Sequence, residues 1–272
     1  MIQAGSGGMD VDAQGRIYHA DFGATLDGPP GTRIHRITPD GTVSVWAEGF
    51  TGASGNAFDS NGNFFQSSIA GNRISRVTPD GQVSTFATNG IDGPVGVANA
   101  DDNLYVANCM GNTIRKVLPD GTTEPFASSS LFNCPNGITL ASDGNFYVAN
   151  FLNGDVLRIA PDGTVSRHVT IEGGNNGHIL FGNGVLYVVA RLANRLYEVT
   201  LDGQTTLLAG SGARGRRDGA ARDAPLSLTH DVALSPDGRT LSFNDVAGTD
   251  PNIRVISPIV VRALVFVEGA TQ

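Results

Sequence analysis

Residues 73–86 read Arg-Ile-Ser-Arg-Val-Thr-Pro-Asp-Gly-Gln-Val-Ser-Thr-Phe, and this stretch decides the fold. β-Branched residues alternate with polar ones on both sides of Pro79-Asp80-Gly81. Because proline fixes φ and glycine supplies the positive φ of a tight turn, the stretch predicts a β-hairpin. The turn recurs with its glycine at positions 41, 81, 121, 163 and 203. We expect its aspartates to be structural, because a turn aspartate hydrogen-bonds its own backbone.

Two further motifs recur with the same period of about 40 residues. Gly-Asn-Phe-Tyr-Val at 144–148 has counterparts at 15–18, 62–65, 103–106 and 184–188. A short apolar strand opens each unit near residues 8, 55, 96, 137, 177 and 231. Six units of four short strands, with no helical pattern, predict an all-β, six-bladed β-propeller of four-stranded antiparallel blades.

The repeats run through the whole chain, so we expect a single domain over residues 1–272. The predicted blades are at about 6–52, 53–93, 94–134, 135–174, 175–228 and 229–270. Since the chain starts on a first strand and finishes near a fourth one, no blade would be shared between its ends. Ring closure would then come from edge contacts of the termini or from pairing by residues 1–5.

Composition excludes several classes of protein. The net charge is −8 and no basic run occurs, so we expect no nucleic-acid partner. Lys116 is the only lysine, which argues against Schiff-base and Walker-type chemistry. The apolar stretch 253–267 is broken by Arg254, Pro258 and Arg262 and is too short for a bilayer, so we expect no membrane association. The first residues lack a signal-peptide pattern, which predicts a soluble protein, cytoplasmic or exported after removal of a leader.

Residues 208–212, Leu-Ala-Gly-Ser-Gly, lead through Asp218-Gly219 to Asp-Val-Ala-Leu-Ser-Pro-Asp-Gly at 231–238. This segment resembles the inter-blade segment of bacterial NHL repeats. The repeats as a whole resemble the NHL-type propellers and their relatives, the senescence-marker-protein/gluconolactonase group, paraoxonases, strictosidine-synthase-like proteins and streptogramin B lyases. The resemblance covers essentially the whole chain and implies an architecture, from which function does not follow.

In a propeller the first strand of each blade lines the central channel and starts at the mouth where ligands bind. The residues before the strand's glycine should therefore converge there: Gly7, Ser54, Val95, Asn136, Asn176 and His230. In the gluconolactonase and paraoxonase relatives this position binds calcium or another divalent cation. The resemblance thus implies Asn136, Asn176 and Asp231 as metal ligands, with His230 as the alternative to Asp231, although Gly7 stands where those relatives have an acid. The alternative is that these asparagines hydrogen-bond to strand ends.

Two histidines are candidate catalytic residues. His178 should face the channel one step deeper than Asn176, because strand side chains alternate, and could exchange protons with His230. The alternative is a hydrogen-bonded histidine that fills the channel. We assign substrate binding to Ser54, Asn150, Phe151, Arg191, Cys109 and Cys134.

The rim of the mouth leaves two questions open. Arg214, Arg216, Arg217 and Arg222 would bind an anionic substrate group or belong to a solvated loop. Cys109 and Cys134 should both lie on the mouth face. They would form a disulfide if the protein is in an oxidising compartment, or remain two reduced thiols in the cytosol.

Three functions follow from these residues. The first is a small-molecule enzyme at the channel mouth, a metal-assisted lactone or ester hydrolase of gluconolactonase-like type, with calcium as the expected cation and no organic cofactor. The second is a non-catalytic NHL-type scaffold whose rim recognises a protein partner or a glycan. The third is a metal-free lyase or cyclase that uses the same pocket.

Overall fold

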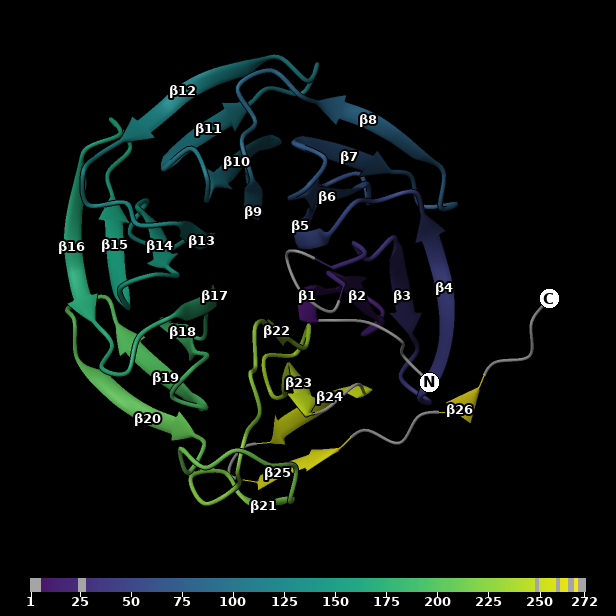
Figure 1. The fold of residues 1–272 in the computed structure, drawn as a ribbon, viewed down its shortest axis with the longest axis vertical. Helices are drawn as coiled ribbons and strands as arrows, with labels where there is room; N and C mark the ends of the chain where they lie inside the picture. Colours follow the sequence, from purple (N-terminus) through teal and green to yellow (C-terminus); the bar gives the residue numbers. More distant parts are fainter. Residues whose placement is uncertain (1–5, 24–27, 248–249, 258–259, 264–266, 269–272) are drawn as a thin grey trace.

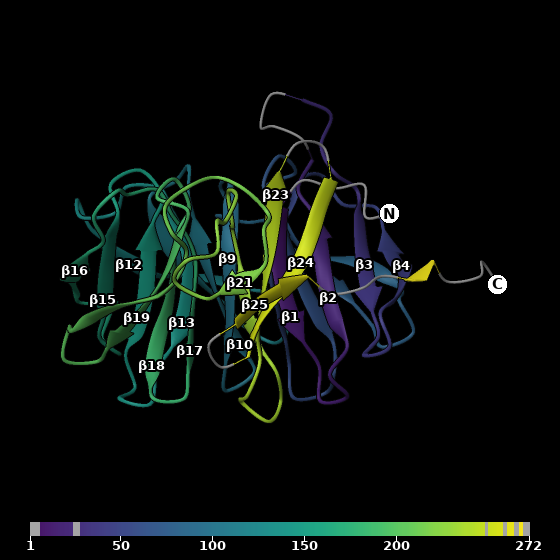
Figure 2. The ribbon, with the colours of Figure 1, turned by 90° about the horizontal axis from the view of Figure 1, so that it is seen from below.

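The computed structural model describes residues 6–23, 28–247, 250–257, 260–263 and 267–268. Within these residues six sheets, each built on four antiparallel strands, are arranged radially around a central channel, as predicted (Figure 1). Seen from the side, the blades form a disc that is about one strand thick (Figure 2). No α-helix occurs in these ranges.

Each blade runs from the channel outward in chain order. Blade 1 is β1 (Ser6–Val11), β2 (Ile17–Asp21), β3 (Arg33–Ile37) and β4 (Thr42–Glu48), and blade 2 is β5 (Ala53–Phe58), β6 (Phe64–Ser68), β7 (Arg73–Val77) and β8 (Val83–Ala87). Blade 3 is β9 (Pro94–Ala100), β10 (Asn103–Asn108), β11 (Thr113–Val117) and β12 (Thr123–Ser128), and blade 4 is β13 (Pro135–Leu140), β14 (Phe146–Asn150), β15 (Asp155–Ile159) and β16 (Val165–Thr170). Blade 5 is β17 (Asn176–Gly182), β18 (Val185–Ala190), β19 (Arg195–Thr200) and β20 (Thr205–Ala209), and blade 6 is β22 (Val232–Leu234), β23 (Leu241–Ala247), β24 (Asp250–Ser257) and β25 (Val260–Ala263).

The Asp-Gly turns join the third and fourth strands of the first five blades, and their aspartates are structural. The carboxylates of Asp40, Asp120 and Asp162 each accept the backbone N–H two residues later, at 3.1, 2.9 and 2.9 Å. These hydrogen bonds lower the pKa of Asp120 and Asp162, because they favour the ionised carboxylate. The repeated aspartates therefore need no ligand to explain them.

The hydrophobic core lies between neighbouring blades rather than at one centre. Between blades 4 and 5, for example, Tyr147 and Val156 pack against Ile179, Leu186 and Val188, and all five are buried. Burying a side chain of this size stabilises the fold by about 1.5–3 kcal/mol. Each blade thus depends on its two neighbours, which makes closure of the ring important.

Ring closure involves a strand that the sequence analysis assigned to blade 6. β26 (Val267–Glu268) pairs in parallel with β4, so blade 1 carries strands from both ends of the chain (Figure 1). The predicted pairing by residues 1–5 lies outside the described residues. A second link is Asn244, whose Nδ2 donates to the Gly7 carbonyl at 2.7 Å and joins blade 6 to blade 1. A short extra strand, β21 (Gly219–Ala220), pairs with β25 at the outer edge of blade 6.

Glycines allow the inner strands to approach one another around the channel. A Cβ atom built on Gly96 would lie 2.3 Å from the Asn136 carbonyl oxygen, and one on Gly55 would lie 2.4 Å from the Val95 carbonyl oxygen. Neither distance is compatible with a side chain. The radius of the channel is therefore set by backbone contact at these glycines.

We expect Gly96→Ala to lower the free energy of unfolding by about 1–3 kcal/mol, because the new methyl group must push two inner strands apart. Gly219→Ala is the matched control, since a Cβ there meets no atom within 4 Å and the substitution should change stability by less than about 0.5 kcal/mol. Urea unfolding of both variants measures the difference. Equal stability of the two would contradict the close approach.

Candidate functional site

The six inner strands can be aligned through their pairing with the second strands. In each of the first five blades, one residue of the inner strand pairs with the residue that lies two positions before the end of the second strand. These inner-strand residues are Met9, Asn56, Val97, Ile138 and Ile179. Val232 pairs with Phe243 in blade 6. The residues just before them are Gly8, Gly55, Gly96, Gly137, His178 and Asp231, which we call the ring positions. Four ring positions are glycines, and the two that carry side chains lie on adjacent blades.

This alignment corrects the equivalence of Asn136 and Asn176 that the sequence suggested. Asn176 pairs with Ala190 as Pro135 pairs with Asn150, so Asn176 lies one position earlier than Asn136. Gly177 has the position of Asn136, and a Cβ on Gly137 would lie 2.5 Å from the Cα of His178. The sequence comparison was misled because Gly177 looks like the ring glycine of the other blades.

The two ring side chains bind each other. The Nδ1 atom of His178 lies 3.0 Å from Oδ2 of Asp231, and both side chains are buried. The Asp231 carboxylate also accepts the backbone N–H groups of Met9 at 2.6 Å and Val232 at 2.7 Å. Because the carboxylate accepts only, Nδ1 of His178 carries the proton and the lone pair of the neutral ring is on Nε2. Nε2 is buried and has no hydrogen-bond partner among the residues described.

His230 lies next to this pair, on the side of the mouth. Its ring centroid is 4.9 Å from that of His178 and 6.5 Å from those of Phe22 and Phe151. Burial, and then the charges of His178 and Arg191, hold the pKa of His230 well below its ordinary value. His230 is therefore a neutral imidazole near pH 7. The structure thus brings His178, His230 and Asp231 together.

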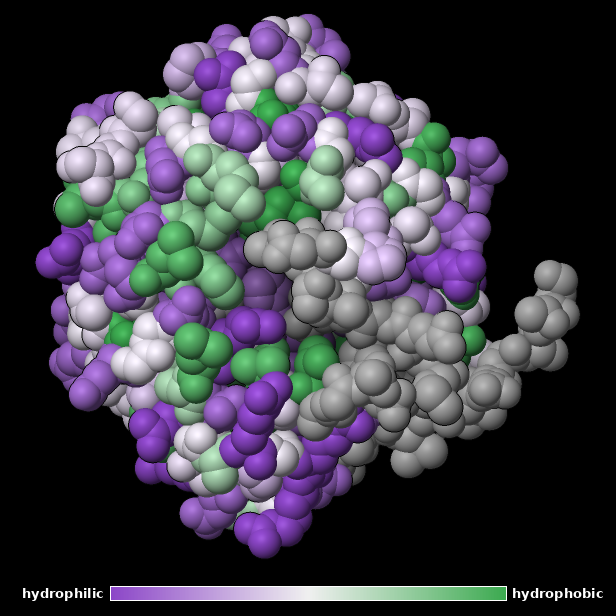
Figure 3. All heavy atoms as spheres, in the orientation of Figure 1, coloured by the Kyte–Doolittle hydropathy of each residue, from purple (hydrophilic) through white to green (hydrophobic). Residues whose placement is uncertain are grey.

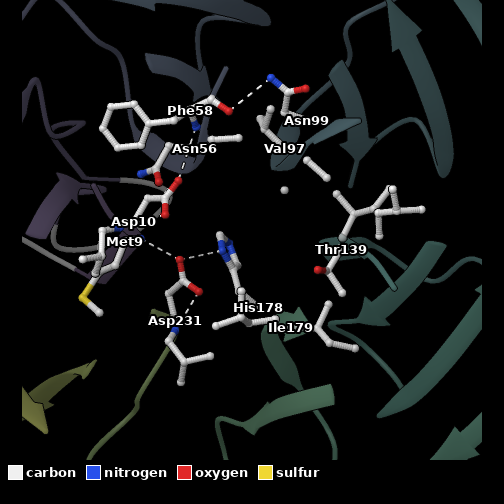
Figure 4. Close-up of a pocket in the computed structure, with 18 residues that line it drawn as sticks. Met9, Asp10, Asn56, Phe58, Val97, Asn99, Thr139, His178, Ile179 and Asp231 are labelled. Carbon is white, nitrogen blue, oxygen red and sulfur yellow. Dashed lines mark hydrogen bonds and ion pairs between the residues drawn. The ribbon is translucent and has the colours of Figure 1, made fainter. Parts of the chain in front are cut away.

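The channel contains a cavity of about 300 Å³ to which all six inner strands contribute (Figure 4). Its lining includes the later residues of these strands, such as Val11, Phe58 and Asn99, so it extends from His178 away from the mouth. The sequence placed the site at the start of these strands only. His178 stands between the predicted mouth and this cavity.

Asp10 is a lining residue that the sequence analysis missed. Desolvation by burial, with a smaller contribution from the charge of Asp231, raises the pKa of Asp10 to about 7. Hydrogen bonds from the backbone N–H groups of Val11 at 2.8 Å and Phe58 at 3.3 Å oppose this shift only in part. The signal was present, because the next residue after Asn56 and Val97 is alanine where blade 1 has an acid.

The three proposed metal ligands differ in their hydrogen bonds, and the side-chain oxygen of Asn176 is buried without a partner among the described residues. Both oxygens of Asp231 accept hydrogen bonds, and the amide nitrogen of Asn136 donates to the Asn176 carbonyl oxygen at 3.1 Å. No group of three His, Cys, Asp or Glu side chains in the described ranges could hold a metal ion. The assignment of Asn136, Asn176 and Asp231 as ligands of a divalent cation therefore stays a prediction.

The remaining predicted residues lie around the mouth. Asn150 accepts the Asn133 backbone N–H at 3.2 Å and donates to the Leu131 carbonyl at 2.9 Å, so it fixes the connection to blade 4. Ser54 is buried, and its hydroxyl has no partner in the described part of the chain. Cys109 and Cys134 form a disulfide that joins blades 3 and 4, which answers the question left open by the sequence.

Apolar side chains surround the mouth. The disulfide packs with Ile69 and Val95, against Phe22 and Phe151. Met110, Leu152 and Leu192 follow the second strands of blades 3, 4 and 5 and are more than half exposed. Figure 3 shows hydrophobic residues around the central hollow on this face of the molecule. The mouth can therefore accept a ligand with apolar groups.

Comparisons with solved structures agree with the fold at low sequence identity. A catalytically inactive virginiamycin B lyase from Staphylococcus aureus, in which one histidine is replaced by alanine, solved with quinupristin, is 18% identical (TM-score 0.67; 97% of this chain, 96% of that one). A gluconolactonase from Xanthomonas campestris is 16% identical (TM-score 0.72; 96% and 87%), and a chain of a nidogen/laminin complex is 14% identical (TM-score 0.70; 84% and 86%).

No curated protein matches the chain by sequence. Among the described residues there is no helix with the length and apolar character that crossing a membrane would require. Residues 28–212, more than half of the chain, match the sequence model of the virginiamycin B lyase family. The six-bladed fold, its lyase neighbours and this match agree, and the chain belongs to the virginiamycin B lyase family.

Proposed function

We propose that the protein is a lyase that cleaves an ester bond of a small molecule in the central channel, with His178 as the base. The observation that carries the proposal is the hydrogen bond from His178 Nδ1 to Asp231, which leaves the lone pair of Nε2 unpartnered beside a cavity. A neutral imidazole oriented by a carboxylate is a suitable base near pH 7. The membership of the lyase family supports the same reading.

An elimination needs only groups that this channel contains. Nε2 of His178 takes a proton from a carbon next to a carbonyl group, the electron pair forms a carbon–carbon double bond, and the ester oxygen on the next carbon leaves as a carboxylate. While it is protonated, Asp10 can donate a hydrogen bond to the carbonyl oxygen as negative charge develops there. The ring of His230 lies beside that of His178, with the two centroids 4.9 Å apart, and borders the reacting group on the side of the mouth.

Hydrolysis of a lactone or ester is the second candidate, supported by the gluconolactonase among the structural neighbours. The same His178–Asp231 pair would then activate a water molecule. A scaffold that binds a protein partner is the third, with the nidogen/laminin neighbour and the apolar mouth as its support. A scaffold of this kind would turn over no substrate.

We expect His178→Gln to lower kcat by about 10²- to 10⁴-fold, because it removes the base and leaves the channel shape nearly unchanged. Asp231→Asn should have a smaller effect, since it removes only the group that orients the ring. Turnover of quinupristin and of gluconolactone measures both effects.

The matched control is His168→Gln, because His168 lies on the outer strand β16, where it contacts the Thr200 carbonyl at 3.0 Å, and should keep full activity. Dialysis against EDTA should also leave turnover unchanged. Equal rates for the His178 and His168 variants would refute the role of His178.

Turnover in ¹⁸O-labelled water separates elimination from hydrolysis. We expect no ¹⁸O in the products and a new absorbance from the double bond, because elimination consumes no water. Mass spectrometry of the products is the measurement. One ¹⁸O atom in a product carboxylate would identify a hydrolase, and the lyase proposal would be wrong.

Asp10→Asn should stabilise the protein at pH 8 and have little effect at pH 4. The pKa of Asp10 is raised in the folded protein, so its contribution to stability is complete below the unfolded value of 3.8 and is lost as the pH rises towards about 7. The gain at pH 8 should be of the order of 2–4 kcal/mol. Thermal unfolding at the two pH values tests this, and a loss of stability at pH 8 would contradict it.

A further inference from the structure

The channel cavity opens on the face of the propeller that lies opposite the mouth. At the ring positions the inner strands are buried, as at Gly96 and His178. Further along the inner strands, Ala98 and Leu180 are partly exposed and Leu140 is 36% exposed. All five residues line the cavity of about 300 Å³. A ligand can therefore enter from this face without passing the mouth.

The orientation of the Asn56 amide is fixed by its neighbour Gln66. The Nε2 atom of Gln66 donates to three backbone carbonyl groups, at 2.9, 3.0 and 2.9 Å. Its Oε1 atom therefore accepts, and it takes a hydrogen bond from Nδ2 of Asn56 at 3.3 Å. This leaves Oδ1 of Asn56 buried without a hydrogen-bond partner among the described residues. Because Asn56 lines the cavity, this oxygen is an acceptor that a ligand can use.

Three side chains that line the cavity carry hydrogen-bond acceptors (Figure 4). The first acceptor is Nε2 of His178, which is buried without a partner in the described part of the chain because Asp231 keeps the proton on Nδ1. The second is Oδ1 of Asn56. The third is the carboxylate of Asp10, to which the Phe58 N–H on the strand of Asn56 donates at 3.3 Å. The cavity therefore suits a ligand that donates several hydrogen bonds.

The charges around the cavity favour a cation. Burial raises the pKa of Asp10 to about 7, and the nearby negative charges of Asp231 and Asp12 add to this shift. An ionised Asp10 therefore lies among other acids. A positive group bound beside it would offset the cost of its charge.

The remaining walls fit the hydrocarbon part of an organic ligand. Val97, Ile138 and Ile179 are apolar and line the cavity. The volume of about 300 Å³ is far larger than a single inorganic ion needs. An organic cation can place its N–H groups at the acceptors and its carbon atoms against these walls.

The turns on the face opposite the mouth add negative charge. Each first strand is joined to the second at this end, and in five of the six blades the turn contains aspartate: Asp12, Asp59, Asp101, Asp102, Asp143 and Asp237. The same turns contain two arginines, of which Arg16 is paired with Asp12 at 2.5 Å and the other is Arg239. This excess of acids attracts cations to the entrance of the cavity and repels anions.

We propose that the cavity binds the ammonium group of a small organic amine, which enters from the face opposite the mouth. A primary ammonium ion has three N–H donors and a positive charge, so it can satisfy the acceptors of His178, Asn56 and Asp10 with charge-assisted hydrogen bonds. The site rests on the lining of the cavity and does not depend on the proposed ester cleavage. If that cleavage takes place in the same channel, the bound amine occupies the base and inhibits the reaction.

The test is a titration with cyclohexylammonium chloride at pH 8 and constant ionic strength, followed through NMR signals of isoleucine methyl groups. Ile138 and Ile179 line the cavity and should give saturable shifts, whereas Ile159, which is buried between blades, should give none. Cyclohexanecarboxylate has the same ring and the opposite charge, so it should give no saturable shift. Tetramethylammonium has the charge but no N–H donor, and should bind at least about tenfold more weakly.

Asp10→Asn should weaken the binding of cyclohexylammonium about 10- to 100-fold, because it removes the charge and leaves the shape of the cavity nearly unchanged. Asp101→Asn is the matched control, since Asp101 is an exposed acid on the same face and its loss changes the net charge equally. Asparagine also tolerates the φ of 51° at this position. The control should weaken binding by less than about threefold, because solvent screens its charge. No saturation in the wild type, or an equal loss of affinity in the two variants, would overturn the proposal.

Inhibition of ester cleavage separates this proposal from the proposed function. Cyclohexylammonium should inhibit competitively, because it occupies Nε2 of His178. Binding that leaves turnover unchanged would show that the amine does not reach His178, and would overturn the part of His178 in the cation site. A protein that binds the amine but cleaves no ester would refute the proposed function and leave the cation site standing. Ester cleavage without saturable binding of the amine would refute the cation site alone.

Discussion

Close contact between the inner strands is the constraint on which the rest of the molecule depends. At four ring positions the strands approach within a distance that excludes even a methyl group, and this narrowness determines what two side chains can do at the other two. The Cε1 atom of His178 reaches to 3.0 Å from where a Cβ of Gly55 would stand. A side chain at residue 55 would displace the imidazole. The glycines are thus part of the site as well as part of the scaffold.

Several polar groups in the channel and at its mouth destabilise the folded state. Asp10 loses solvation, Nε2 of His178 is buried without a partner, and Arg191 has no anion beside it among the described residues. The free-energy cost of each such group is small compared with the stabilisation from the many side chains buried between blades. A propeller tolerates them because its core is divided among the interfaces between neighbouring blades, each of which buries its own set of apolar side chains. Groups that cost stability and share one channel are typical of functional sites.

The sequence predicted the scaffold better than the site, for a physical reason. Turns and strands repeat, because every blade solves the same packing problem, so the period is visible without a structure. A functional site requires the repeats to differ from one another. Such differences do not recur along the sequence, so periodicity cannot reveal them. Gly177 was mistaken for a ring glycine, and Asn176 was therefore placed one position too late in the alignment. The strand β26 has only two residues, too few for a recognisable sequence pattern. The sequence could place both cysteines on the same face of the propeller, but it could not give the distance between them. The disulfide between Cys109 and Cys134 is seen only in the structure.

The two sides of His178 differ in their titratable groups, and under the proposed function this difference would orient a substrate. Towards the mouth lie Arg191 and the neutral ring of His230, whereas the cavity beyond His178 contains Asp10. In the proposed cleavage, the end of the substrate that enters the cavity meets the carboxyl group of Asp10, and the other end stays on the side of His230. Its carbonyl group would then share the cavity with His178 and Asp10, which both line it. The asymmetry therefore favours a single direction of binding, in which the oriented base meets the bond that has to break.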